Sequence, residues 1–502
     1  MPYSAPKLKD PSLFVGKNYV DGQWIESVSG KRFDVHDPAS GALIGSCPES
    51  VAQDAEQAIK IAAAALPEWR SRTGRNRSRI LRRWYELVIE NKEDLATLIT
   101  WENGKAGPDA AGEVLFAASF LEWFAEEAPR VYGDVIPHSA PGFRVSVIKE
   151  PVGVVGLITP WNFPAAMITR KLGPALAAGC TAVVKTAGET PFTANALLVL
   201  GERAGVPKGV INSIAALENT PEIGQTLCAS DVVRKISFTG STRVGKILMN
   251  QSSDTLKKLS LELGGNAPFI VFDDADLDLA IAGAIASKFK CSGQTCVCSN
   301  RIFVQKGIYS QFVEKLKAVV SKFQVGHGFD SKTTHGPLVT AAAAERVDDL
   351  VKEAVKAGAK VEVGGKRRTD LGKSRPNFFE PTILTNVTTD MRLVRDEIFG
   401  PLAPIFSFDN EDEVVDIANK CDVGLASYIF TQDVNRVARV TELLHFGMVA
   451  VNTGIMSDAA APFGGVKHSG MGREGSKYGI EDYLHVKTIV TGNVNVVHRA
   501  LL

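Results

Sequence analysis

Short apolar runs alternate with helical patterns through the middle of the chain. Between residues 152 and 272, the runs VGVVGLI, TAVVK, GVINSI, VVRKISF and PFIVF have the length and composition of buried strands. Helical patterns lie between several of them, at 165–178, 193–204, 221–228 and 241–250. This alternation predicts βαβ units and a mostly parallel sheet. Such a sheet binds ligands beyond the carboxyl ends of its strands.

The flanking regions predict further elements. Residues 1–50 suggest hairpins, and helices follow from Val51. The apolar face of one of these helices is formed by Ile80, Leu81, Trp84, Leu87 and Val88. The segment FRVSVIKEPVGVVGLI predicts a strand. A second alternating region, from about 275 to 460, includes the helices IYSQFVEKLKAVVSKF and AAAAERVDDLVKEAVKAG and the strand ASYIFT. The final YLHVKTIVTGNVNVV is strand-like, and its open edge would suit a partner subunit.

Composition and charge narrow the class of protein. The chain has 502 residues, 45% of them apolar and 22% charged, which is ordinary for a globular protein of several domains. Lys+Arg and Asp+Glu balance at 56 each, so no overall charge favours nucleic acid or an anionic membrane. No apolar run is long enough to span a bilayer, and the N-terminus lacks a signal core. We therefore expect a soluble, cytoplasmic protein.

Two stretches partly match phosphate-binding motifs. GSTRVGKI, at 240–247, fits a P-loop at Gly240, Gly245 and Lys246, but Ile247 replaces the hydroxyl residue that would hold magnesium. It predicts either a plain strand–helix turn or a helix N-terminus that faces a pyrophosphate. GMGREG, at 470–475, contains G-x-G-x-x-G but no strand precedes it, so a loop is expected.

Three of the seven cysteines lie in the stretch CSGQTCVCSN, at 291–300. The C-x-C spacing and the absence of a nearby histidine argue against a zinc site, and we expect no metal. An odd cysteine count fits a reducing compartment, which disfavours a structural disulfide. Buried inert thiols and a reactive nucleophile both stay open.

Neighbouring residues favour the nucleophile. Gly293, Gln294 and Thr295 precede Cys296 in a segment with a helical pattern, and a helix N-terminus would lower the pKa of the thiol. Glu262 ends the strand run before Gly-Gly in LELGGNAP, where it is either a surface charge or a base held at a strand end.

Six stretches in this order resemble the motif series of the aldehyde dehydrogenase superfamily: TPWNFP, FTGSTRVGK, LELGGNAP, GQTCVCSNR, EIFGPLAP and PFGGVKHSGMGREG. The resemblance covers nearly the whole chain. GQTCVC and REGSKYGIEDYL are most similar to the succinate-semialdehyde dehydrogenase branch, which implies a place in GABA degradation. The implied α/β fold has a Rossmann-type NAD(P)-binding domain (1–139 and 153–270), an α/β catalytic domain (271–462) and small β oligomerisation or bridging segments (140–152 and 463–502).

The resemblance assigns the chemistry. It implies that Cys296 attacks an aldehyde to give a thiohemiacetal, whose oxyanion is held by Asn162 and by the backbone N–H of Cys296. Hydride leaves to a bound nicotinamide, and Glu262 activates the water that hydrolyses the thioester. Without the family, Asn162 would be taken as a turn residue.

The resemblance also implies a cofactor site. Its residues would be Thr159, Trp161, Asn162, Lys185, Gly188, Gly240, Ser241, Leu263, Glu397 and Phe399. Lys185 would contact the adenosine ribose and Glu397 the nicotinamide ribose, although a lysine at a strand end is also consistent with a solvated cation. NAD-preferring relatives often carry Glu at the position of Gly188, where a carboxylate would repel a 2′-phosphate. We therefore predict use of NADP, or of both cofactors, although the adjacent Glu189 weakens the distinction.

For the substrate, the branch implies an aldehyde that carries a carboxylate. Arg170 and Ser457 match two of its carboxylate ligands, whereas Lys290 replaces a second arginine and cannot form a bidentate pair. On sequence alone, Arg170 is equally an ordinary charge on a helix face. In this branch a disulfide between Cys296 and Cys298 can switch enzyme activity off. The resemblance gives no role to Cys291.

Alternative functions remain open: a dehydrogenase for glutarate semialdehyde or for an aromatic or specialised-metabolite aldehyde, or a non-catalytic binding protein on the same fold. A homodimer or homotetramer is implied, with no nucleic acid or membrane partner.

Overall fold

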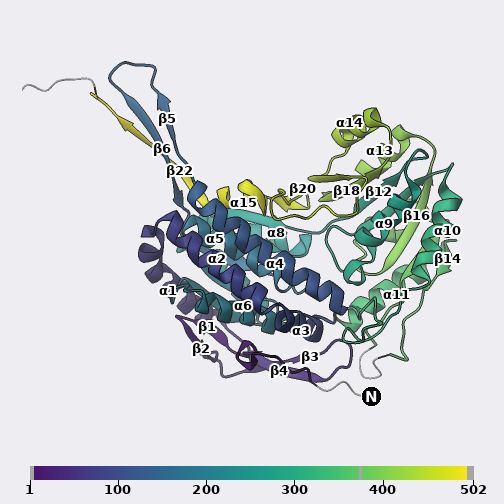
Figure 1. Ribbon diagram of the computed structural model, residues 1–502, viewed down its shortest axis with the longest axis horizontal. Coiled ribbons are helices and arrows are strands. Elements are labelled where there is room, and N and C mark those ends of the chain that lie inside the picture. Colours follow the sequence, from purple (N-terminus) through teal and green to yellow (C-terminus); the bar gives the residue numbers. More distant parts are fainter. Residues whose placement is uncertain (1–4, 372–375, 495–502) are drawn as a thin grey trace, which may run out of the picture.

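The computed structural model describes residues 5–371 and 376–494. It has two lobes, each built on a sheet, and a narrow three-stranded arm that projects from the first lobe (Figure 1). No helix within the described residues is long and apolar enough to cross a membrane.

The first lobe contains an eight-stranded sheet. Its strands are β1 (Asn18–Val20), β2 (Gln23–Ile25), β7 (Val154–Ile158), β8 (Thr181–Thr186), β9 (Ile211–Ala215), β10 (Val233–Thr239), β11 (Lys258–Glu262) and β21 (Gly470–Met471). Their order is β2–β1–β9–β8–β7–β10–β11–β21. The five strands from β9 to β11 are parallel, and the strand order reverses between β7 and β10. Ligands of open parallel sheets bind at this switch point.

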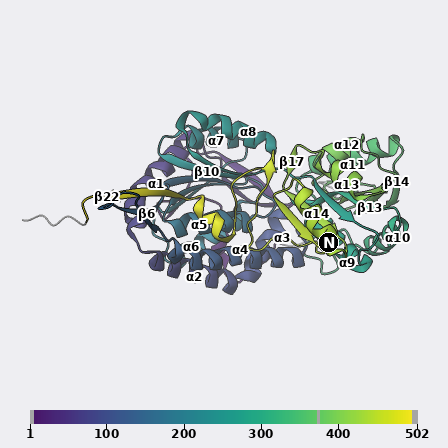
Figure 2. The ribbon, with the colours of Figure 1, turned by 90° about the horizontal axis from the view of Figure 1, so that it is seen from above.

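Helices cover both faces of this sheet (Figure 2). One face carries α1 (Ala52–Ser71), α7 (Thr220–Ala229) and α8 (Thr242–Gln251). On the other lie α5 (Ala166–Ala178) and α6 (Pro191–Arg203), with α2 (Gly74–Glu90), α3 (Lys92–Asn103) and α4 (Gly107–Glu127) packed over them. Apolar side chains fill both interfaces, for example Ile59 and Ile236 on one side and Phe124 and Leu172 on the other. Burial of each such side chain stabilises the fold by about 1.5–3 kcal/mol.

The second lobe is built on a seven-stranded sheet. Its strands, in spatial order, are β14 (Lys360–Val363), β15 (Thr382–Thr385), β16 (Leu402–Phe408), β13 (Ser299–Gln305), β12 (Ala267–Val271), β18 (Ala426–Phe430) and β19 (Met448–Val451). Its helices are α9 (Leu277–Lys288), α10 (Tyr309–Val320), α11 (Ala341–Lys356), α12 (Arg392–Arg395), α13 (Glu411–Asn419) and α14 (Val434–Leu443). All strands except β14 are parallel to their neighbours.

Smaller elements complete the chain. The arm pairs β5 (Asp134–Pro137) and β22 (Leu484–Thr491) with opposite edges of β6 (Arg144–Pro151). The remaining strands and α-helix are the hairpin β3 (Arg32–His36) and β4 (Leu43–Pro48), the pair β17 (Val423–Gly424) and β20 (Val466–Lys467), and α15 (Ser476–Glu481). Within the described residues, four short 3-10 helices lie at Pro11–Leu13, Ala128–Arg130, Ser253–Thr255 and Lys290–Gly293.

The predicted α/β architecture is confirmed, and α5 to α8 begin and end within two residues of the expected helices. Two details differ. FRVSVIKEPVGVVGLI forms two strands, β6 and β7, which belong to different sheets because the chain turns at Gly153, whose φ is +124°. The arm already begins at Asp134, so a boundary at 140 falls inside the β5–β6 hairpin. The last residues of the expected C-terminal strand, 495–497, lie outside the described residues.

Candidate active site

The loops after three neighbouring strands meet at the switch point. β7 leads into residues 159–164, β10 into Gly240 and Ser241, and β11 ends at Glu262. The Ser241 hydroxyl accepts a hydrogen bond from the Val244 N–H at 3.4 Å and thereby caps α8. The N-terminus of α8 therefore opens at the carboxyl edge of the sheet, where its backbone N–H groups and dipole favour an anion.

These loops form one wall of a cavity of about 390 Å³, which we call the interlobe cavity. The facing wall comes from the second lobe, at the start of α11 and at residues 397–399. Seven of the predicted cofactor residues line it: Trp161, Asn162, Gly240, Ser241, Leu263, Glu397 and Phe399. Cys296 and Glu262 line the same cavity.

The interlobe cavity has the features that a nicotinamide dinucleotide needs. Glu397 Oε1 accepts the Gly265 N–H at 3.1 Å, and a Cβ at Gly264 would lie only 2.9 Å from Glu397 Oε2. The carboxylate is thus held at the wall with acceptor capacity left for ribose hydroxyls. Phe399 meets Trp161 edge-on, with 5.7 Å between the ring centroids, and offers an apolar surface for a flat ring. The residues present therefore fit this cofactor.

Three predicted cofactor residues, all within the described chain, do not line the interlobe cavity: Thr159, Lys185 and Gly188. Lys185 is buried in β8, where burial lowers its pKa to about 8, and its carbonyl accepts the Thr159 N–H at 3.2 Å. A Cβ at Gly188 would lie 2.7 Å from Leu217, so a larger residue would require rearrangement. The adjacent Glu189 does line the cavity, and its negative charge partly opposes the lowering of the Lys185 pKa by burial.

The segment before the nucleophile candidate is not a helix. Cys291, Ser292 and Gly293 have φ of 53°, 54° and 75°, and only a short irregular 3-10 turn spans 290–293. Three consecutive left-handed residues break the helical hydrogen-bond ladder. The prediction of a helix N-terminus beside Cys296 is therefore wrong.

Cys296 lies in the tight turn between this segment and β13. The Cys298 N–H donates to the Thr295 carbonyl across it at 3.1 Å. Burial raises the pKa of the Cys296 thiol to about 12, while the positive charge of Arg170 opposes this rise. The expected lowering of the thiol pKa is thus also wrong for the protein without ligands. A neutral thiol needs a base before it can attack.

Glu262 is the base candidate within the same cavity. The residue is 3% exposed, and neither carboxylate oxygen has a hydrogen-bond partner in the described chain. Burial raises its pKa well above the usual range, and the negative charge of Glu474 raises it further. Glu474 is itself paired with Lys171 Nζ at 2.6 Å. Sequence reasoning missed Glu474 and Lys171, although Glu474 belongs to the GREG stretch that carried part of the resemblance.

Asn162 is oriented toward the segment before the nucleophile. Its Nδ2 donates to the Gln294 carbonyl at 3.0 Å, while its Oδ1 is buried without a partner among residues 5–371 and 376–494. A side-chain amide has two N–H donors, so one remains for a ligand. The Gly-Gly turn after Glu262 packs against this region, because a Cβ at Gly265 would lie 2.3 Å from the Cys296 carbonyl oxygen.

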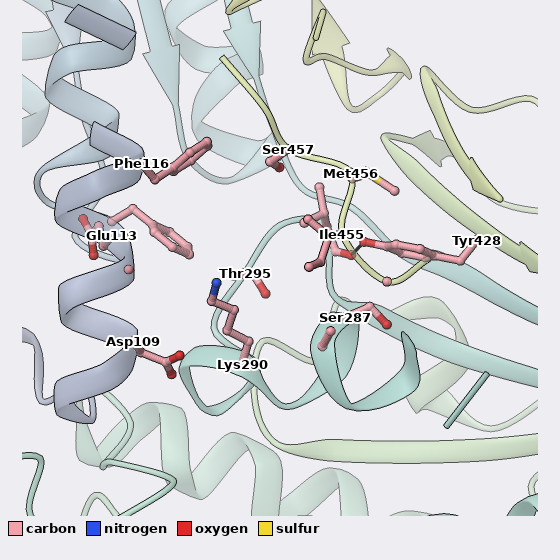
Figure 3. Close-up of a pocket in the computed structure, with 15 residues that line it drawn as sticks. Asp109, Glu113, Phe116, Ser287, Lys290, Thr295, Tyr428, Ile455, Met456 and Ser457 are labelled. Carbon is pink, nitrogen blue, oxygen red and sulfur yellow. Dashed lines mark hydrogen bonds between the residues drawn. The ribbon is translucent and has the colours of Figure 1, made fainter. Parts of the chain in front are cut away.

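A second cavity of about 190 Å³ lies beside α4, and we call it the α4 cavity (Figure 3). Thr295 lines it, whereas the next residue, Cys296, lines the interlobe cavity, so the nucleophile turn separates the two. Lys290 and Ser457 both line it, as the resemblance implied. The other labelled side chains that surround it are Asp109, Glu113, Phe116, Ser287, Tyr428, Ile455 and Met456. The sequence analysis did not predict the residues from α4 as site residues, because the sequence pattern of α4 does not distinguish the face that carries them.

Lys290 is the one cation that lines the α4 cavity in the described residues. Its ammonium points into the space between α4 and Thr295, and it forms no ion pair with any described carboxylate (Figure 3). Asp109 is otherwise engaged, because it accepts the Cys291 N–H at 2.8 Å. An anionic group in this cavity would therefore meet an available ammonium.

Arg170 does not line either cavity. It is 2% exposed, its Nε lies 3.7 Å from Glu474 Oε2, and its guanidinium stacks 4.2 Å from the centre of the Phe463 ring. Arg170 is therefore a buried partner of Glu474, and unlike Lys290 and Ser457 it does not line the cavity where a substrate carboxylate was expected.

The seven cysteines are all unpaired. The Cys298 thiol is buried and donates to the Lys288 carbonyl at 3.3 Å. Cys291 is also buried, and burial raises its pKa to about 12. In the described part of the chain, no three Cys, His, Asp or Glu side chains group together as metal ligands would.

Comparison with known proteins agrees with this geometry. The sequence model of the aldehyde dehydrogenase family matches residues 24–489. The chain is 53% identical to a glutarate-semialdehyde dehydrogenase of Pseudomonas aeruginosa, over 97% of this chain and 100% of that protein. It is 52% identical to a succinate-semialdehyde dehydrogenase [NADP(+)] of Saccharomyces cerevisiae, over 98% of each. The crystal structure of a succinate-semialdehyde dehydrogenase from Burkholderia pseudomallei superposes with a TM-score of 0.95 at 52% identity, over 97% of this chain and 100% of that one.

Proposed function

Because this chain belongs to the aldehyde dehydrogenase family and oxidises an aldehyde with NAD or NADP, we propose that its substrate is succinate semialdehyde. The observation that carries this proposal is the Lys290 ammonium, which points into the α4 cavity on the far side of the turn that bears Cys296. An aldehyde held at Cys296 with its carboxylate at Lys290 would span that turn. Ser457 lines the same cavity and adds a hydroxyl donor.

We propose the following roles for the residues of the interlobe cavity. Glu262, a buried carboxylate of raised pKa, takes the proton of the Cys296 thiol, and the sulfur then attacks the aldehyde carbon. The free N–H of Asn162 stabilises the oxyanion of the thiohemiacetal. Glu397 and the N-terminus of α8 would hold a nicotinamide dinucleotide, which would supply the hydride acceptor. Glu262 releases the thiol proton to solvent before hydrolysis, and the ionised carboxylate then accepts a proton from the water that attacks the thioester on Cys296. The C–S bond breaks, the carboxylic acid leaves, and the sulfur takes its proton back from Glu262.

Replacement of Lys290 tests the substrate. In Lys290→Met we expect kcat/KM for succinate semialdehyde to fall by roughly 10- to 100-fold, because a charged hydrogen bond is worth about 1.5–3 kcal/mol. Butanal has the same chain length without the carboxylate, and its kcat/KM should change by less than about twofold. Lys332→Met, at an exposed lysine outside both cavities, is the matched control. An equal loss for both aldehydes, or a wild-type preference for butanal, contradicts the proposal.

Glutarate semialdehyde is the second candidate. Lys290 stands where the branch has arginine, and Arg170 does not line the cavity, so one flexible cation, aided by the Ser457 hydroxyl, recognises the anion. A long lysine stem can follow a carboxylate at more than one distance from the reacting carbon. The ratio of kcat/KM for the two semialdehydes decides between them.

For the cofactor, we propose that NADP is accepted and that Glu189 limits its use. Gly188 removes the carboxylate that would repel a 2′-phosphate, but Glu189 brings one to the cavity wall. In Glu189→Gln we expect kcat/KM for NADP to rise about fivefold or more while that for NAD changes less than twofold, since two like charges about 4 Å apart cost about 1 kcal/mol even in bulk water. A wild-type preference for NAD of tenfold or more, or an unchanged ratio in the variant, rejects this assignment.

We further propose that a second copy of the chain pairs with the arm. β5 and β22 are the two edges of the arm sheet, and they expose apolar side chains such as Val135, at 73%, and Val486, at 67%. An exposed apolar edge favours strand pairing with another chain. Light scattering should give a dimer or tetramer, and a monomer at micromolar concentration would reject the proposal.

Redox control is a separate proposal. Cys296 and Cys298 share one turn, and a peroxide could take two electrons from their thiols, with loss of two protons, to form a disulfide. Mild peroxide should then inactivate the wild type in a way that dithiol reverses. Identical, equally reversible inactivation of Cys298→Ala would exclude the pair.

A further inference from the structure

The turn that carries Asn162 is held in place by the corner between α3 and α4. Asn103, the last residue of α3, donates through Nδ2 to the Trp161 carbonyl at 2.9 Å. From α4, Glu113 Oε1 accepts the Ala165 N–H at 2.9 Å and the Ala166 N–H at 3.4 Å. The residues before and after Asn162 are therefore both tied to elements outside their own sheet.

Glu113 replaces a cap that α5 lacks in its own sequence. The residue at the N-cap position is Ala165, which has no side-chain acceptor. The first N–H groups of a helix need acceptors, and a carboxylate there is also favoured by the helix dipole. Glu113 belongs to α4, more than fifty residues earlier in the chain. This cap therefore fixes the position of the first turn of α5 relative to α4.

Lys105 holds Glu113 and the turn together. Its ammonium pairs with Glu113 Oε2, and the two side chains are only 3% and 0% exposed. The same ammonium lies 3.8 Å from the centre of the Phe163 ring, the residue next to Asn162. A buried charge without its partner is strongly unfavourable, so the pair restricts both side chains to this arrangement.

The far side of Asn162 is fixed by the nucleophile segment, where its Nδ2 donates to the Gln294 carbonyl. The amide is thus held directly by that segment, while the α3–α4 corner holds the residues on both sides of Asn162. Glu113 and Phe163 both line the α4 cavity, so the corner is also the cavity wall (Figure 3).

We propose that Glu113, supported by Lys105, is a positioning residue that sets the Asn162 amide at the distance required for oxyanion stabilisation. The inference rests on the proposed role of Asn162. Its physical basis is that a displacement of about 1 Å in such a donor costs about 10²-fold in rate.

A double-mutant cycle tests the inference, with kcat/KM for the aldehyde at saturating cofactor as the readout. Glu113→Ala should lower kcat/KM roughly tenfold or more in the wild-type background. In the Asn162→Ala background, the same change should lower it by less than about twofold, because the donor that Glu113 positions is already absent. A general structural defect would lower kcat/KM by the same factor in both backgrounds, and that additive result overturns the inference.

Two further variants keep the test decisive. Glu113→Gln preserves the side-chain volume and one acceptor, so it should disturb folding less than the alanine variant does, although it removes the charge that pairs with Lys105. We expect a loss of about threefold or more in kcat/KM that vanishes in the Asn162→Ala background. Glu126→Ala, an exposed α4 residue paired with Arg82, should leave kcat/KM within twofold. If Asn162→Ala alone has no effect, the proposed role of Asn162 fails instead, which separates the two outcomes.

Discussion

Cys296→Ala should lower aldehyde oxidation by roughly 10⁴-fold or more, because no other side chain in the interlobe cavity can form the thiohemiacetal. The variant should still bind NADPH with a dissociation constant within about twofold of the wild type, since alanine removes no cofactor contact. Trp161 and Phe399 line that cavity, so quenching of tryptophan fluorescence on titration reports cofactor binding directly.

The other cysteines of the cluster provide matched controls. Cys291→Ala and Cys298→Ala alter thiols that are buried away from the cavity, so each should retain activity within about tenfold. Mass spectrometry of the wild type quenched during turnover should find the acyl group on the peptide that contains Cys296. Substantial activity in Cys296→Ala, or an acyl label on another residue, is incompatible with covalent catalysis at this sulfur.

The sequence predicted the parallel sheets and the residues at their carboxyl ends, because both depend on local patterns. The apolar runs and helical patterns predicted β7 and β10. Residues that follow these strands, such as Asn162 and Ser241, line the interlobe cavity. The resemblance to the aldehyde dehydrogenase superfamily, drawn from six ordered stretches, is confirmed by the family match across residues 24–489.

What the sequence could not predict depends on distant contacts. The strained turn before Cys296 is stabilised by Asp109 from α4 and by the close approach of Gly293 to the Gly400 carbonyl, neither of which has a local signal. Arg170 was expected at the substrate because it matches an arginine that the resembling branch carries eight residues after Asn162. In the structure its partner is Glu474, which comes from the C-terminal segment, and no local pattern predicts that contact. Burial also reversed the expected pKa of Cys296, since desolvation outweighs any nearby dipole.

Glu262→Gln should lower kcat by roughly 10²- to 10⁴-fold, because both thiol deprotonation and hydrolysis lose their base. Solvent can still deprotonate the thiol slowly, so an acyl group should accumulate on Cys296 over many minutes. Glutamine has nearly the same shape but cannot accept the proton of the hydrolytic water, so the thioester persists. Mass spectrometry should therefore show close to one acyl group per enzyme after mixing with aldehyde and cofactor, and hydroxylamine should release it. Loss of activity with no trapped acyl group, even after long incubation, would mean that Glu262 acts only on the thiol and would reject its role in hydrolysis.

The pH profile gives an independent measure of the same carboxylate. Burial and the charge of Glu474 raise the pKa of Glu262, so the acid limb of kcat should lie above the pH at which an ordinary carboxyl titrates. In Glu474→Gln the repulsive charge is lost, while the amide oxygen can still accept from Lys171, so the Glu262 carboxylate forms more easily and the limb should move to lower pH. Glu481→Gln, an exposed residue paired with Lys149, should leave it in place. An acid limb that stays fixed or moves to higher pH in Glu474→Gln would mean that another group governs the profile.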